Sequence, residues 1–371
     1  MKIGIMTFWW SEDNYGQLLQ CYALQKYLRD LGHEAYLIRY RPDNDIAQDP
    51  LIIKIYKALN PKKLYNFAKN RINRKKLEIE RKNNDRQFEL FRQKYITQSE
   101  FFYSSLKELQ DTPPEADAYI VGSDQVWNFW NMPIEKCKNI IHAYFLDFGS
   151  EKAKRMSFAA SWGRTKVSNE EIAEITPLLK RFDYVSVREK NGIELCSKCN
   201  FDRAEWICDP TLLLSAETYR KIYCESEIRR KEKKFLLLYM LGNECDFDIK
   251  TAYEFAAKKN IEVVYVSGND LTANRQKTFA TIPEWLYLVD NAEYVITNSF
   301  HCGVFSMIFH KQFGIVPLTG TCAGMNARLS SLFELTGIGE RFVTSGRFEV
   351  LDRKYTPKEI IISNNFLSLL K

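Results

Sequence analysis

The sequence contains no hydrophobic run long enough to cross a membrane. A transmembrane helix needs about 20 consecutive apolar residues, whereas the longest apolar stretches, FLLLYML and the run after Cys302, are short or broken by His310 and Lys311. The opening MKIGIMTFWW is followed at once by acidic residues and lacks a small-residue cleavage site, so we expect no secretory signal. These absences predict a cytoplasmic protein.

Metal-binding and dinucleotide-binding motifs are also missing. The chain has only four histidines, and they do not recur with carboxylates at the spacing of metal ligands. Cys196 and Cys199 form a CxxC pair with no second pair and no histidine nearby, so the nine cysteines are interpreted mainly as buried free thiols. No GxGxxG follows a predicted strand. We therefore predict neither a metal ion nor a bound cofactor.

The composition is that of a folded protein with more than one domain. The 371 residues are 45% apolar and 27% charged, and they are too many for one ordinary core. An alternation of strands and helices begins with KIGIMTF, QLLQCYALQKYLRDLG and EAYLIRY, and a second series begins at KFLLLYML after the charged stretch EIRRKEKK. The sequence predicts two α/β domains with parallel sheets, residues 1–226 and 227–371, that enclose a cleft.

A basic segment interrupts the first series at about residues 51–98. Residues 54–94 contain fourteen Lys or Arg against four Asp or Glu. One interpretation is a basic amphipathic helix that lies on an anionic membrane surface, as a peripheral contact at the inner face of the cell membrane. The other is a solvated helix with one packed face. Nucleic acid is not an expected partner, because basic charge alone is weak evidence.

Polar clusters follow predicted strands, at the place where open α/β sheets bind ligands. Asn14, Tyr15 and Gly16 precede the first helix and form either a hydroxyl or anion site or ordinary helix capping. A second cluster combines a carboxylate, an amide and an indole, which suits a sugar, although a polar turn with a buried tryptophan is the alternative. Its residues are Ser123, Asp124, Gln125 and Trp127.

Two arginines also lie beside predicted strand ends. Arg188 follows the strand YVSV, from which its guanidinium would bind a phosphate or carboxylate, unless it forms a salt bridge with Glu189. Arg328 opens the helix after TGTCAGM and would contact the same anion.

The stretch YVITNSFHCGVFSMIF places a histidine between a strand and a helix. Asn298 or Ser299 is expected to cap the helix that starts near His301. The unpaired N–H groups of the first turn and the positive end of the helix dipole would hold an anion beside the imidazole. Because histidine gains or loses a proton near neutral pH, we predict an acid–base role for His301.

Together these segments resemble the polysaccharide pyruvyl transferase family. The likeness runs from NYGQLLQCYALQKYL through ADAYIVGSDQVWN, FAASWG, YVSVREK and CDPTLLL to ITNSFHCGVFSMIFHKQF and RLSSLFELTG. The resemblance implies a GT-B-like fold, in which two Rossmann-like domains face each other across a cleft. It also implies transfer of a pyruvyl group from phosphoenolpyruvate to a sugar, with formation of a pyruvate ketal and release of phosphate.

The resemblance further implies the acceptor and the residue roles. The acceptor would be a unit of a capsule, exopolysaccharide or other cell-envelope glycan, or its lipid-linked precursor. The catalytic residues would be His301, Asp124 and Arg188; the donor-binding residues would be Arg188, Asn298, Ser299, His301 and Arg328; the acceptor-binding residues would be Asn14, Tyr15, Gly16, Ser123, Asp124, Gln125 and Trp127. Some members carry Arg-Leu-His where this chain has Ser299-Phe300-His301, so a cation is missing beside the histidine.

Two other functions stay open at the level of the sequence. A sugar-nucleotide glycosyltransferase of GT-B fold would share the cleft and the basic segment. A non-catalytic relative that binds a glycan or a phosphate would share the fold without turnover.

Overall fold

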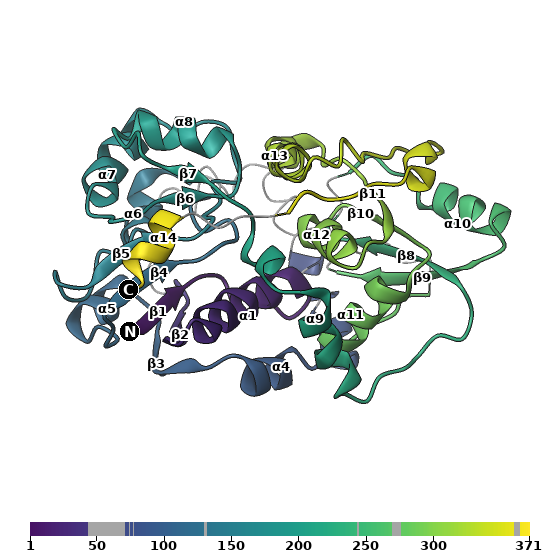
Figure 1. Cartoon of the computed structure of the whole chain (residues 1–371), viewed down its shortest axis with the longest axis horizontal. Coiled ribbons are helices and arrows are strands. Elements are labelled where there is room, and N and C mark those ends of the chain that lie inside the picture. Colours follow the sequence, from purple (N-terminus) through teal and green to yellow (C-terminus); the bar gives the residue numbers. More distant parts are fainter. Residues whose placement is uncertain are drawn as a thin grey trace.

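The computed structural model contains two α/β domains, each built around a parallel sheet (Figure 1). It describes residues 1–43, 71–73, 75–76, 78–129, 132–242, 245–268, 276–359 and 364–371. Residues 51–70, 74 and 77 of the predicted basic insertion lie outside the described residues, whereas residues 71–73, 75–76 and 78–83 are helical. Within the described part of the chain, no helix combines the length and apolarity that a membrane crossing requires.

The first domain has a five-stranded parallel sheet with strand order β3-β2-β1-β4-β5. The strands are β1 (Lys2–Met6), β2 (Glu34–Tyr40), β3 (Gln98–Tyr103), β4 (Ala118–Val121) and β5 (Lys154–Ser157). Parallel bridges from Met156 to Tyr184 and from Ala160 to Val187 continue the sheet toward a short pair of strands. That pair is β6 (Ser186–Val187) and β7 (Glu205–Trp206).

Helices cover this sheet and connect its strands. They are α1 (Tyr15–Asp30), α4 (Phe88–Tyr95), α5 (Leu106–Asp111), α6 (Ile134–Tyr144), α7 (Asn169–Leu179) and α8 (Asn191–Lys198). The sequence interpretation missed β3 and α5, because it resumed the alternation only at the segment ADAYIVGSD, which begins at Ala116. The edge strand β3 begins at Gln98, so residue 98 belongs to the sheet and not to an insertion.

The second domain has a four-stranded parallel sheet with strand order β11-β10-β8-β9. Its strands are β8 (Phe235–Met240), β9 (Glu262–Ser267), β10 (Tyr294–Thr297) and β11 (Gln312–Ile315). The central strand β8 reads FLLLYM and is buried along its whole length, as expected for a parallel strand covered on both faces. The helices are α10 (Ile249–Lys258), α11 (Ile282–Asn291), α12 (Phe300–Ile308) and α13 (Ala327–Thr336).

The chain crosses between the domains at places that the sequence did not indicate. Helix α9 (Ala216–Cys224), predicted in the first domain, packs on α11, where Arg220 Nε lies 2.8 Å from Asp290 Oδ2. Helix α14 (Asn364–Leu369), predicted in the second domain, returns to the first, where the Phe366 ring lies 4.9 Å from that of Phe158. Both chain termini accordingly lie on the first domain (Figure 1). The predicted boundary between residues 226 and 227 therefore assigns both helices to the wrong domain: α9 packs on the second domain and α14 on the first.

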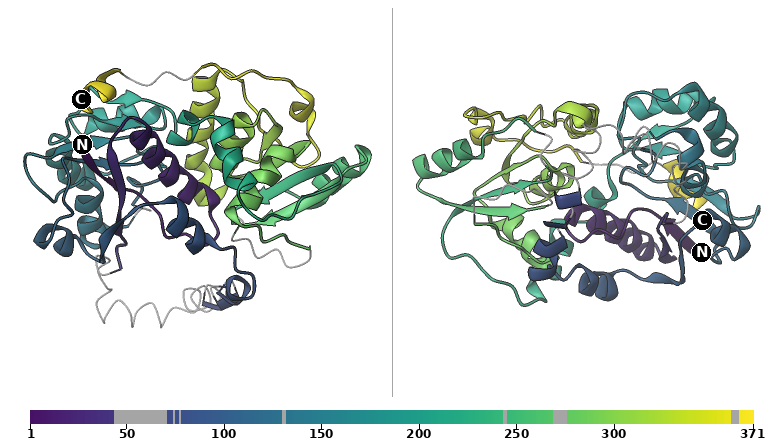
Figure 2. Two further views of the ribbon diagram at one scale, coloured as in Figure 1. Left: turned by 60° about the horizontal axis from the view of Figure 1, so that its bottom comes forward. Right: turned by 180° about the vertical axis from the view of Figure 1, so that it is seen from behind.

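Helix α1 joins the two domains at its N-terminus (Figure 2). Tyr15 is fully buried there, and its hydroxyl donates a hydrogen bond to the carbonyl of Ala280 in the second domain, at 2.7 Å. Its ring stacks on that of Trp285 at 5.1 Å. The start of α1 is thus fixed in the core of the opposite domain.

Candidate active site

Arg188 lies directly after β6 and points toward the junction of the domains. Its Nη1 donates to Asp209 Oδ2 at 2.9 Å and to Ser123 Oγ at 3.3 Å, and the residue is 3% exposed. Glu189 does not pair with it: Glu189 Oε1 instead accepts from the Gly163 N–H at 2.8 Å. The structure therefore contradicts the predicted alternative of an Arg188–Glu189 salt bridge. Nε and Nη2 of Arg188 are buried without a hydrogen-bond partner.

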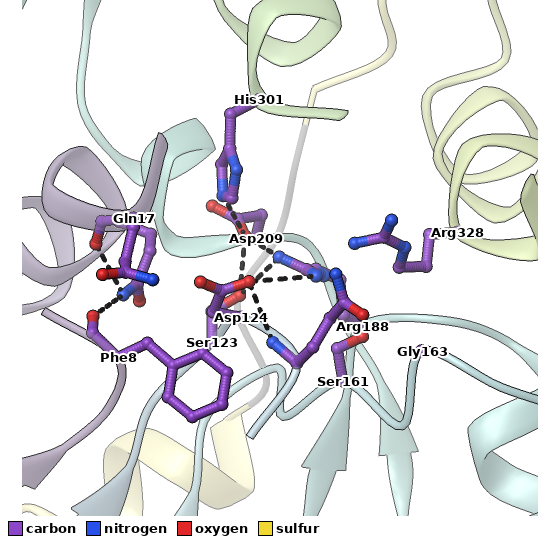
Figure 3. Close-up of polar contacts among 12 residues, drawn as sticks. Phe8, Gln17, Ser123, Asp124, Ser161, Gly163, Arg188, Asp209, His301 and Arg328 are labelled. Carbon is purple, nitrogen blue, oxygen red and sulfur yellow. Dashed lines mark hydrogen bonds and ion pairs between the residues drawn. The ribbon is translucent and has the colours of Figure 1, made fainter. Parts of the chain in front are cut away.

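Asp209 is the residue on which the polar groups of the site converge (Figure 3). It follows β7, and its Oδ1 accepts from the N–H of Thr211 at 3.0 Å, which holds the carboxylate in place. Its Oδ2 accepts from Ser123 Oγ at 2.6 Å as well as from Arg188. Burial alone would raise the pKa of Asp209, but His301, Arg188 and Ser123 outweigh it and hold that pKa well below the usual range. Asp209 is therefore ionised near neutral pH.

The sequence interpretation assigned no role to Asp209, although CDPTLLL was among the segments that carried the family resemblance. A usable signal was present: an aspartate followed by proline directly after a short strand is suited to cap a turn at a strand end. That signal identifies a cap. It does not reveal that Oδ2 faces a cation from another strand.

His301 comes from the second domain and meets the same carboxylate. Ser299 is the N-cap of α12, and its side chain accepts from the Cys302 N–H at 3.3 Å, which confirms one of the two predicted caps. His301 Nε2 lies 3.4 Å from Asp209 Oδ2, an ion-pair distance without the geometry of a hydrogen bond. On its other side the ring rests on Gly16, where a Cβ atom would lie 2.2 Å from His301 Nδ1.

Arg328 adds a second buried guanidinium near the first. Both cations lie over the ring of Phe300, with Arg188 at 4.4 Å and Arg328 at 5.7 Å from its centroid. Among the described residues, no carboxylate lies within ion-pair distance of Arg328, whose Nε donates to the Met325 carbonyl at 3.1 Å. Burial, and then repulsion by Arg188, lower the pKa of Arg328 to about 10. This concentration of positive charge favours an anionic ligand.

The predicted sugar-binding cluster divides into two parts. Asp124 has an unusual positive φ of 76° and places its Oδ1 4.0 Å from Arg188 Nη2, so it belongs to the site together with Ser123. Gln125 is half-buried, and its Oε1 accepts from Asn128 at 2.9 Å. Trp127 is fully buried, and its Nε1 donates to the Tyr144 carbonyl at 3.1 Å. The alternative of a buried tryptophan is therefore correct, and Trp127 is not positioned to stack on a sugar.

Two further predicted contacts are corrected by burial and bonding. Tyr15 is fully buried between the domains, so it is not available to an acceptor. Asn298 accepts from the N–H of Leu241 at 2.7 Å and donates to its carbonyl at 2.8 Å, so its amide holds the end of β8 and not a donor molecule. Asn14 remains a candidate, because its Oδ1 makes no hydrogen bond at the start of α1. Gly16 contributes close approach to His301.

No group of three or more metal-ligating side chains gathers in the part of the chain that the structure describes. The site instead consists of carboxylates, guanidiniums, a hydroxyl and an imidazole. Its chemistry is that of anion binding and proton transfer.

Comparison with solved structures shows the fold. The UDP-GlcNAc 2-epimerase of Methanocaldococcus jannaschii, solved with UDP-GlcNAc and UDP, is similar with a TM-score of 0.50 and 13% identity, over 100% of this chain and 99% of that one. The UDP-N-acetylglucosamine 2-epimerase of Rickettsia bellii is similar with a TM-score of 0.51 and 10% identity, over 95% and 85%. At such identities the likeness concerns architecture alone, and it agrees with the predicted GT-B-like pair of Rossmann-like domains.

Comparison by sequence shows the family. No curated protein matches the chain. The family model for polysaccharide pyruvyl transferases matches residues 14–317, which include Arg188, Asp209 and His301. That match covers most of the sequence and agrees with the resemblance found in its motifs. The chain therefore belongs to the polysaccharide pyruvyl transferase family.

Proposed function

We propose that this protein transfers the pyruvyl group of phosphoenolpyruvate to a sugar of a surface polysaccharide or its precursor. The observation that carries the proposal is the meeting of His301 and Arg188, from opposite domains, at one carboxylate oxygen of Asp209. Such a convergence places an acid–base group and an anion-binding group side by side in a buried site, where electrostatic interactions are strong.

The donor would bind as a multiply charged anion. Phosphoenolpyruvate carries a phosphate and a carboxylate, and the site offers two buried guanidiniums, Arg188 and Arg328. The first N–H groups of α12 have no partners within the helix and add a positive dipole end at Phe300 and His301. Asp209 keeps Arg188 oriented, since it fixes Nη1 and leaves Nε and Nη2 for the ligand.

The chemistry requires a proton donor at the methylene carbon of phosphoenolpyruvate. A protonated His301 would supply that proton through Nε2, and the charge that develops at C2 would be oxocarbenium-like. A sugar hydroxyl then attacks C2 and loses its proton, for which Asp124 is the candidate base. Phosphate leaves with the electrons of its C–O bond and takes up a proton. The proton on phosphate comes from Asp124, and a second hydroxyl closes the ketal and gives its own proton to His301, so that both side chains return to their starting states and atoms and charge balance.

The ionised Asp209 has a second role in this scheme. Its Oδ2 lies 3.4 Å from His301 Nε2, so the carboxylate helps to fix the position of the imidazole ring. Asp209 acts through Arg188 and His301, so it is a positioning residue.

The decisive measurement is which product appears from which donor. Inorganic phosphate released from phosphoenolpyruvate in the presence of glycan acceptors supports the proposal. Release of a nucleoside diphosphate from sugar nucleotides would favour the glycosyltransferase alternative. Donor binding without turnover across the acceptors would favour the non-catalytic one.

A further inference from the structure

Arg86 is a buried cation outside the candidate active site. It lies just before α4, is 4% exposed, and stacks over the ring of Phe279 at 5.1 Å. Its Nη2 donates to the carbonyl of Gly268 at 3.0 Å, but Nε and Nη1 are buried without a hydrogen-bond partner. A buried charge without an anion is costly. Among the described residues, Arg86 therefore has no anionic partner to offset the burial of its charge.

Two other arginines of the same region already have carboxylate partners. Arg81 pairs with Asp13, and Arg92 Nε lies 2.8 Å from Glu89. Among the described residues, no carboxylate lies within ion-pair distance of Arg86. Its neighbour Asp85 uses Oδ1 to accept from the Gln87 N–H at 2.8 Å. Within the described ranges of the chain, no side chain therefore supplies the missing negative charge at Arg86.

A cavity adjoins this arginine. It has a volume of about 470 Å³, which is within the usual range of ligand sites. Four of its wall residues are cationic, four are acidic and two are uncharged: Glu12, Glu78, Arg81, Lys82, Asn84, Asp85, Arg86, Phe88, Glu89 and Arg92. Two of its four acids, Asp85 and Glu89, are engaged by the contacts above, so an oxygen-rich anion in the cavity would meet Arg86, whose Nε and Nη1 make no hydrogen bond.

The cavity and the candidate active site both adjoin the N-terminus of α1. Phe88, another wall residue, packs against Tyr15 with a ring distance of 5.1 Å. Burial raises the pKa of Tyr15 and the nearby charge of Arg86 opposes that rise, so the two side chains lie close together. The next residue, Gly16, packs against the ring of His301. An anion at Arg86 would thus bind near Tyr15, whose neighbour in the chain, Gly16, contacts His301.

We propose that the Arg86 cavity binds the diphosphate group through which the acceptor sugar is carried. This inference rests on the proposed function for its acceptor, because glycan precursors are commonly held as diphosphate esters. The donor anion would bind to Arg188 and Arg328, and the diphosphate of the acceptor would bind to Arg86. The separation of the two sites lets one ligand be tested without the other.

The experiment measures the change in Tm caused by inorganic pyrophosphate and by phosphoenolpyruvate. The wild type is compared with Arg86→Gln, with Lys82→Gln, and with Arg328→Gln. Lys82 is an exposed cation of the same wall, so Lys82→Gln is matched in charge. A ligand that binds the folded state raises Tm by a few degrees at saturation.

We expect pyrophosphate to raise the Tm of the wild type, of Lys82→Gln and of Arg328→Gln, but not of Arg86→Gln. Phosphoenolpyruvate should still act on Arg86→Gln and lose its effect on Arg328→Gln. An undiminished pyrophosphate shift in Arg86→Gln overturns the inference and leaves the proposed function intact. If phosphoenolpyruvate raises the Tm of none of these proteins while the expected pyrophosphate shifts are observed, phosphoenolpyruvate is excluded as the donor and the inference about the Arg86 cavity is still supported.

A structure of the wild type soaked with pyrophosphate is the second test, because Arg86→Gln removes a stacked side chain and can impair folding. Pyrophosphate against Arg86 Nε or Nη1 supports the inference, and an empty cavity at saturating pyrophosphate overturns it. The carrier is distinguished by repeating the titration with UDP and with farnesyl diphosphate. Tighter binding of UDP indicates a nucleotide-linked acceptor, and tighter binding of farnesyl diphosphate indicates a lipid-linked acceptor. In either case Arg86→Gln must weaken the binding of that ligand.

Discussion

A single carboxylate organises the polar side chains of this site. Asp209 Oδ2 is shared by Ser123 and Arg188 and lies near His301, so one buried negative charge serves two cationic groups. A buried charge pair is weak evidence for stability, because desolvation offsets much of its Coulomb attraction. The arrangement is better explained by the need to hold an imidazole and a guanidinium in fixed positions.

The first prediction concerns the ionisation of Asp209. Because the pKa of Asp209 is lowered on folding, its contribution to the free energy of unfolding is complete above the ordinary value of 3.8 and is lost as pH falls below it. Asp209→Asn leaves Arg188 buried without its anion, at a cost of about 3–5 kcal/mol at neutral pH. Urea unfolding at several pH values should show the difference from the wild type shrinking below pH 3.8. A difference that stays constant at acidic pH would contradict the assigned ionisation.

The second prediction concerns proton transfer by His301. His301→Gln should lower kcat by about 10²–10⁴ while donor binding is retained, since general acid–base catalysis typically contributes that factor. His310→Asn is the control just beyond the end of α12: His310 is exposed and has a φ of 55°, which asparagine tolerates. Phosphate release under saturating donor is the measurement. Equal rates for the two variants would remove His301 from the acid–base role.

The third prediction concerns donor binding by Arg328. Position 299 is a serine in this chain, so the cation that some members place beside the histidine must come from elsewhere, and Arg328 is buried nearby with no carboxylate partner among the described residues. Arg328→Gln should weaken phosphoenolpyruvate binding by about 2–4 kcal/mol. Arg347→Gln, an exposed cation of the same domain, should not. Calorimetric titration decides, and equal affinities for both variants exclude Arg328 as a donor contact.

At the scale of elements, the site depends on two helix N-termini that meet from opposite domains. Helix α12 presents His301 and α1 presents Gly16, with no room for a side chain between them. Only glycine permits this approach, because any Cβ would overlap the imidazole. The helices therefore position the histidine by contact as well as by the cap at Ser299.

The fourth prediction is that Gly16→Ala displaces His301. The added methyl group would lie 2.2 Å from Nδ1, so the ring must turn away from Asp209. We expect kcat to fall at least tenfold, with a loss of about 1–3 kcal/mol in the free energy of unfolding from overpacking. Gly324→Ala is the matched control, since its Cβ would meet nothing within 4 Å. Normal turnover in Gly16→Ala would show that the contact does not set the position of His301.

At the scale of the whole molecule, the two domains are joined by more than one crossing of the chain. Tyr15 enters the core of the second domain, and the C-terminal helix α14 returns to the first. The Lys154 Nζ donates to the Leu369 carbonyl at 2.5 Å, and Phe366 is fully buried. The last residues are therefore part of the first domain's core.

The fifth prediction follows from that packing. Phe366→Ala removes an aromatic side chain from a cluster with Phe158 and Tyr184, which should cost about 3–5 kcal/mol of stability. Ser368→Ala, an exposed position on the same helix, should change little. Denaturant unfolding is the measurement. Similar midpoints for both variants would mean that α14 does not stabilise the first domain.

The sequence was most informative where local chemistry decides. The alternation of strands and helices, the cap at Ser299, and the candidates Arg188 and His301 all follow from periodicity, capping and placement after strands. The errors arose where a side chain has two possible environments. Trp127 was assigned to an acceptor because an indole can stack on a sugar ring, and Tyr15 because it stands at the start of the first helix, but both side chains are buried in the core.

The sequence by itself determined the two α/β domains, the family and the residues at strand ends, because these depend on patterns within short segments. Only the tertiary structure decided that Asp209 joins Arg188 to His301, that Gly16 supports the histidine, and that Arg86 is buried without an anion. The reason is physical: charge pairing and steric contact act between atoms that are close in space, and these atoms come from chain segments far apart in sequence.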